Sequence, residues 1–157
     1  MVKVDIISDN ELVIYLYNNI NGINFKEELC VKNFLKDLFV KLNDYYDIKI
    51  EGYYDVDVYI DEIYGIVLDL VKDDIDFYDY YSNTVDMKII IKRCKFLYLV
   101  EDYDIDFKKF YVYKLVNNVY LLPKIKLNYI ELGSLIENSK VIYNSDDIVK
   151  KAIKINC

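Results

Sequence analysis

The spacing of apolar side chains changes abruptly near residue 47, and this change limits the folds open to the chain. From residue 48 to residue 60, apolar side chains recur at every second position, which is the period of a half-buried strand. Before residue 47 they recur at intervals of three and four, which is the period of an amphipathic helix: Val31, Phe34, Leu35, Leu38 and Leu42. A long helix followed by a long strand indicates an α+β fold.

Two short β-rich runs precede the helix. Residues 4–7 and 12–17 flank a polar four-residue loop and predict a hairpin. Asn24, with Glu27 three positions later, resembles a capping box, so the helix is predicted to begin at Phe25. It should end near Asp44.

The long strand is expected to turn at Asp61 and Glu62 and to pair with a second strand that runs to Leu70. Residues 1–72 would then form a ββαββ unit, in which one long amphipathic helix covers a four-stranded antiparallel sheet. Such a unit can bury one face of the sheet and one stripe of the helix without further elements.

The rest of the chain is predicted in two parts. Residues 73–84 are rich in Asp and Tyr and break every periodicity, which indicates an acidic loop or linker. Residues 85–157 contain β-hairpins, one with its turn at Asn117 and Asn118, followed by short C-terminal helices, the last of which has Ser145 as its N-cap. At 157 residues the two halves could be separate domains or one continuous domain.

The acidic residues are concentrated together with the tyrosines. The chain carries a net charge of −7, and residues 44–86 alone contain thirteen acids, two bases and nine tyrosines. Side chains two apart in a strand share a face, so one face of the long strand should present Tyr53, Asp55, Asp57 and Tyr59. Carboxylates attract a basic protein segment, and tyrosine rings accept Lys or Arg by cation–π contact. An ordinary solvated strand face is the alternative interpretation.

Several kinds of chemistry are excluded by composition. The chain has no histidine, which removes every mechanism that needs an imidazole. Its three cysteines are far apart and odd in number, which fits neither a disulfide framework nor a zinc site and indicates reduced, intracellular thiols. The four glycines are isolated, so no phosphate-binding loop can be drawn. We therefore expect no cofactor.

The sequence also argues against a membrane and against nucleic acid. No apolar run approaches the ~20 residues of a spanning helix, and the start of the chain lacks a secretory signal, so a cytoplasmic protein is expected. Basic residues gather between Lys88 and Lys95, but Arg93 is the only arginine, and the acidic segment would repel phosphates.

Carboxylates are the abundant reactive groups, which leaves one enzymatic alternative open. Asp69, Asp86 and Lys88 have the residue types of a carboxylate-dependent metal enzyme such as a nuclease, in which acids hold a divalent ion and a lysine orients water. Alternating charges on a surface strand explain the same residues without a metal, and we expect no metal site.

Three segments of the first half resemble a known family. Phe34 to Phe39 (FLKDLF), Gly52 to Val58 (GYYDVDV) and Gly65 to Leu68 (GIVL) occur in the order found in the substrate-binding half of MecA-type adaptors, which deliver proteins to the bacterial ClpC protease. The resemblance covers the first 72 residues and implies a protein-binding role like that of an adaptor.

The sequence therefore predicts a non-enzymatic, intracellular protein-binding module of adaptor-like type. Its partner is expected to be a protein that offers a basic segment. Residues 87–157 carry eight acids and thirteen bases, opposite in sign to the middle of the chain. Such opposed charges could also pair across the interface of a homodimer.

Overall fold

The computed structural model describes residues 2–17, 23–73, 85–101 and 107–155, and it has the predicted α+β fold. The chain divides into two compact units. The first comprises Met1–Val58 and Ile66–Lys92, and the second comprises Tyr59–Gly65 and Arg93–Cys157. The acidic segment predicted as a loop, residues 73–84, lies outside the described residues apart from Asp73.

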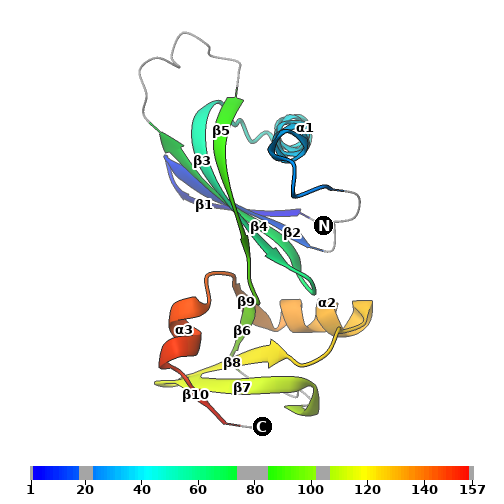
Figure 1. The fold of residues 1–157 in the computed structure, drawn as a ribbon, viewed down its shortest axis with the longest axis vertical. Helices are drawn as coiled ribbons and strands as arrows, with labels where there is room; N and C mark the ends of the chain where they lie inside the picture. The colour runs from blue at the N-terminus through cyan, green and yellow to red at the C-terminus, as the bar shows by residue number, and fades with distance from the viewer. Residues whose placement is uncertain (1, 18–22, 74–84, 102–106, 156–157) are drawn as a thin grey trace. The chain divides into compact units, whose positions relative to one another are not determined.

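The first unit contains a five-stranded sheet and one long helix, α1 (Glu28–Tyr46). The strands lie in the order β1-β2-β4-β3-β5, and Figure 1 shows α1 beside them. Their bounds are β1 (Val2–Ser8), β2 (Glu11–Tyr17), β3 (Gly52–Asp61), β4 (Gly65–Asp73) and β5 (Val85–Arg93). The last three residues of β3, the first of β4 and the last of β5 are grouped with the second unit.

The fifth strand corrects the prediction of a four-stranded sheet. Residues 85–93 were expected in the second half of the chain, but β5 lies beside β3 at the edge of the first sheet, and its Met87 is buried. Alternating apolar residues show that a segment is a strand, but they do not show which strand it pairs with. The boundary between the compact units therefore falls after Lys92.

Helix α1 buries the stripe that its periodicity predicts, but rotated slightly toward Phe39. Its buried residues are Val31, Leu35, Phe39 and Leu42, whereas Phe34 and Leu38 are only half-buried. The predicted start is wrong by one turn, because α1 begins at Glu28.

Asn24 closes a turn before the helix instead of capping it: its side-chain oxygen accepts a hydrogen bond from the backbone N–H of Lys26. Its carbonyl accepts a second from the backbone N–H of Glu27. Asn commonly competes with a helix in this way.

The second unit contains an antiparallel sheet in the order β10-β7-β8-β6-β9. Helices α2 (Tyr129–Glu137) and α3 (Asp146–Lys151) and the short 3-10 helix η2 (Phe107–Lys109) accompany it. The strands are β6 (Leu97–Val100), β7 (Phe110–Leu115), β8 (Asn118–Pro123), β9 (Ser139–Ile142) and β10 (Ile153–Lys154). Within the described ranges, no helix is both long enough and apolar enough to cross a membrane.

The β7–β8 hairpin turns one residue earlier than predicted. Leu115 pairs with Asn118, so the turn residues are Val116 and Asn117. Val116 adopts a φ of 56°, a conformation that a β-branched residue rarely takes. The turn was therefore predicted one residue too late, because the prediction relied on the preference of Asn for positive φ.

The last helix begins at the predicted N-cap, but Ser145 does not cap it with its side chain. The buried Ser145 hydroxyl instead donates a hydrogen bond of 2.7 Å to the carbonyl of Lys95. Helix α3 ends at Lys151, whereas the sequence predicts a helix through Ile153, and Ile153 and Lys154 form β10.

Candidate functional site

The structure separates the four residues that the sequence placed on one exposed face of β3. Asp55 is exposed, and Tyr53 and Asp57 are half-buried. Tyr59, which belongs to the second unit, is buried, with 5% of its surface exposed, and its ring centroid lies 4.9 Å from that of Tyr143 in the same unit. The expectation for Tyr59 is wrong because both sides of the last residues of β3 are covered.

The remaining residues belong to a wider group of charges in the first unit. Asp57 forms an ion pair with Lys92 of β5, with 3.4 Å between the Asp57 carboxylate and the ammonium. Both side chains are partly exposed, so this pair by itself adds little stability. Its importance lies in the acids that surround the single lysine.

Asp69 of β4 is the most perturbed of these acids. Burial raises the pKa of the Asp69 carboxyl to about 6, and the hydrogen bond and charge of Glu11 and the charge of Asp57 add to this effect. The ammonium of Lys92 lowers the same pKa but does not cancel the rise. One Asp69 oxygen, Oδ1, is buried without a hydrogen-bond partner among the described residues. More negative charge is gathered here than one lysine neutralises.

The effect of this negative charge extends to Tyr15 of β2. Burial is the largest cause that raises the pKa of the Tyr15 phenol, and the charges of Asp5 and Asp69 raise it further. We call the group formed by Glu11, Tyr53, Asp55, Asp57 and Asp69 the acidic face. Only its β3 residues could be found from sequence periodicity, because Glu11 and Asp69 reach it through strand pairing.

The residues of the alternative metal site have other partners. Asp86 forms an ion pair of 3.7 Å with Lys32 of α1, and Lys88 is exposed. Asp69 belongs to the acidic face. In the part of the chain that the structure describes, no three Cys, Asp or Glu side chains are grouped so that they could hold a metal ion.

The second unit contains a buried carboxylate that sequence reasoning treated only as a turn residue. Asp61 is 6% exposed and accepts three backbone hydrogen bonds. Its Oδ1 accepts from the N–H groups of Ile63 and Tyr64, at 2.7 and 2.8 Å, and its Oδ2 accepts from that of Phe96, at 2.7 Å. Asp61 therefore ties the β3–β4 turn to the start of β6.

A pocket of about 560 Å³ lies beside this carboxylate. Three segments of the second unit line it: the β3–β4 turn from Ile60 to Ile63, residues 93–95, and residues 122–126 at and beyond the end of β8. The first two segments are also joined by a 3.0 Å hydrogen bond from the Cys94 N–H to the Ile60 carbonyl. The walls of the pocket are thus held by backbone hydrogen bonds.

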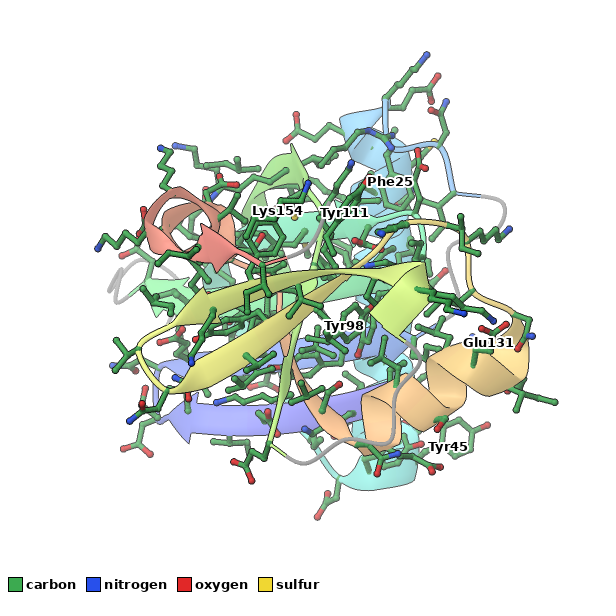
Figure 2. All side chains as sticks on the ribbon, turned by 90° about the horizontal axis from the view of Figure 1, so that it is seen from below. Phe25, Tyr45, Tyr98, Tyr111, Glu131 and Lys154 are labelled. Atoms are coloured by element: carbon green, nitrogen blue, oxygen red, sulfur yellow. The ribbon has the colours of Figure 1, made fainter. Side chains whose placement is uncertain are left out.

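Four cationic side chains line the pocket: Arg93, Lys95, Lys124 and Lys126. The Lys124 ammonium lies 5.0 Å from the centre of the Tyr111 ring. The Lys154 ammonium lies 4.0 Å from the same centre. Figure 2 labels the Lys154 and Tyr111 side chains. Arg93, Lys95 and Lys126, the other cations that line the pocket, form no ion pair within the described ranges.

Comparison with models of known protein families, with curated proteins and with solved structures finds no significant match to this chain.

Proposed function

We propose that this chain is a non-enzymatic, cytoplasmic binding module that recognises a basic segment of another protein through the acidic face of its first unit. The observation that supports the proposal best is the raised pKa of Asp69 among Glu11, Asp57 and Lys92. Three carboxyl groups around one ammonium repel one another. A lysine or arginine from a partner would relieve that repulsion.

The side chains of β3 form a row along which a basic segment could bind. Asp55 and Asp57 are two residues apart on one strand, with Tyr53 preceding them on the same side. A basic side chain can therefore meet a carboxylate at successive positions and a tyrosine ring at the end of the row. Cation–π contact with a partly exposed ring contributes about 0.5 to 1 kcal/mol, so the carboxylates should dominate the attraction.

An adaptor is the more specific form of this proposal. It rests on the resemblance of residues 1–72 to the substrate-binding half of MecA-type adaptors, where the family binds the proteins that it delivers. Cys30 and Cys94 form no disulfide within the described residues, which agrees with a reducing compartment.

The experiment compares the association of a synthetic oligolysine peptide with the full chain and with the double variant Asp55→Asn, Asp57→Asn. Asn keeps the size of the side chain and removes its charge. Stopped-flow fluorescence at several salt concentrations should show slower association and a weaker salt dependence for the variant, because steering charges act mainly on the association rate.

The matched control is Asp37→Asn, Asp44→Asn, which removes the same charge from exposed positions of α1. It should leave the rate and its salt dependence close to those of the unaltered chain. If the two double variants behave alike, only net charge matters, and the proposal of a recognition face is wrong.

Divalent metal distinguishes this proposal from a carboxylate-dependent metal enzyme. A ligand that binds the folded state raises the melting temperature. We expect Mg²⁺, Mn²⁺ and Ca²⁺ to leave the melting temperature unchanged. A rise that disappears in Asp69→Asn or Asp86→Asn would favour the enzyme.

A further inference from the structure

We propose that the pocket of the second unit binds a small organic anion, with a phosphate or carboxylate group held by its cations and an apolar body held by its aliphatic walls. This site is separate from the acidic face, since every residue that lines it belongs to the second unit. Either proposal can therefore fail without the other.

The first argument is the size and rigidity of the pocket. Its volume of about 560 Å³ lies within the range of about 300 to 1,000 Å³ typical of small-molecule sites. The Asp61 carboxylate holds two of its walls together through three backbone N–H groups. The Ser145 hydroxyl fixes the Lys95 carbonyl, and the Lys124 N–H donates to the Lys109 carbonyl at 2.8 Å. A pocket held in this way loses little entropy when a ligand binds.

The second argument is the charge balance inside the pocket. Two acids, Asp61 and Glu62, face four cations. Both oxygens of Asp61 already accept backbone hydrogen bonds, so Asp61 does not neutralise a neighbouring lysine by direct contact. Glu62 is exposed. The excess of positive charge selects an anion.

The individual cations have different roles. The Lys124 ammonium lies over the Tyr111 ring, so it already has an aromatic contact. Arg93, Lys95 and Lys126 are exposed and form no ion pair among the residues that the structure describes. Arg93 presents a planar guanidinium, the group best suited to grip two oxygens of one phosphate or carboxylate.

The third argument is the apolar part of the lining. Ile63, Leu122 and Pro123 contribute aliphatic surface, and Ile125 leaves 57% of its surface exposed between two lysines of the same segment. Inorganic phosphate would not cover this surface. A ligand with a short hydrocarbon body would remove it from water, at about 25 cal/mol for each Å² buried.

The experiment uses hexyl phosphate as the probe in isothermal titration calorimetry with the full chain. Hexanoate tests whether a carboxylate suffices, and inorganic phosphate tests the charged group alone. We expect saturable binding of hexyl phosphate that is tighter than that of inorganic phosphate. Equal binding of hexanoate would identify the natural ligand as a carboxylate or a phosphate, and weaker binding would identify it as a phosphate compound.

Three variants locate the binding. Arg93→Gln, Lys126→Gln should weaken hexyl phosphate binding about tenfold or more, because two charge-assisted contacts are lost. Lys150→Gln, Lys151→Gln removes the same charge from exposed positions of α3 and should have little effect. Ile125→Ser should weaken hexyl phosphate but leave inorganic phosphate unchanged.

All substituted side chains are exposed, so the variants should fold, and an unchanged melting temperature without ligand verifies this. The proposal is overturned if no probe binds saturably to the unaltered chain. It is equally overturned if the two double variants weaken binding to the same extent, since any surface lysine would then serve.

Discussion

Single side chains decide more of this structure than their sequence neighbourhood suggests, and Asp61 is the strongest case. A turn residue at this position needs only local hydrogen bonds, such as those from Ile63 and Tyr64. The additional hydrogen bond from the N–H of Phe96, thirty-five residues away, means that Asp61 also joins segments that are distant in the sequence. Neither the composition nor the periodicity of the sequence contains that information.

We predict that Asp61→Ala destabilises the protein by about 3 to 5 kcal/mol, because it leaves the buried N–H groups of Tyr64 and Phe96 and the part-buried N–H group of Ile63 without an acceptor. Glu62→Ala, the exposed neighbour, should change stability by less than about 0.5 kcal/mol. Urea denaturation of both variants measures the difference. A small effect at Asp61 would show that water can replace its carboxylate and that the pocket walls are not fixed by it.

Asp69 gives the acidic face a measurable pH dependence. Its pKa is raised from 3.8 to about 6 in the folded chain, so the folded state holds the proton more tightly than the unfolded state. Its contribution should therefore lower stability as pH rises from about 4 to about 6, and stay constant above that.

We predict that Asp69→Asn removes this slope and stabilises the chain at pH 7 by about 1 kcal/mol, a modest gain because the carboxyl is partly exposed and screened by solvent. Chemical denaturation at pH 4.5 and at pH 7 measures the slope, with Asp55→Asn as the exposed control. If the pH dependence of stability is unchanged in Asp69→Asn, Asp69 is not its cause.

At the scale of elements, α1 is held to the first unit by the buried side of its stripe. We predict that Leu35→Ala, at a position that is 1% exposed, costs about 2 to 5 kcal/mol. Leu38→Ala should cost less, since Leu38 is half-buried, and Lys36→Ala should be nearly silent. Equal losses at Leu35 and Lys36 in urea denaturation would mean that α1 packs through a different side.

Sequence periodicity predicted elements well and their partners less well. The helix and the β3–β4 hairpin follow from spacing, because a packed element repeats its apolar residues at its own period. The β7–β8 hairpin follows instead from two β-rich runs that flank a polar turn. The placement of β5 in the first sheet does not follow, and neither does β9, which occupies the residues after α2. Pairing depends on contacts between distant segments, which spacing within one segment cannot encode.

The same limit explains what was missed in the candidate sites. Asp55 and Asp57 were found because they alternate along one strand, while Tyr59 was misplaced because alternation does not reveal where both sides of a strand become buried. The pocket was not predicted at all, since its three lining segments are far apart in the chain. Its only sequence signal is the cluster of bases around Arg93, which the sequence suggests as a weak candidate for nucleic-acid binding.

For the whole molecule, the edge strand β1 is the surface most suited to self-association. Ile6 and Ile7 are 72% and 58% exposed on a strand that, among the described strands, has a neighbour on one side only. Exposed apolar edges of this kind favour pairing with a second copy. We predict a concentration-dependent dimer in sedimentation velocity that Ile6→Lys disrupts. If the unaltered chain stays a monomer at every protein and salt concentration, no dimer forms.

The central claim, that the acidic face recognises a basic segment, is tested most directly by NMR titration of the full chain with oligolysine. We predict that the amide signals of β2, β3 and β4 around Glu11, Asp57 and Asp69 shift saturably, and that Asp55→Asn, Asp57→Asn raises the oligolysine concentration needed to produce the same shifts. Shifts that are absent, or that spread over α1 and the second unit without preference for these strands, would contradict the claim.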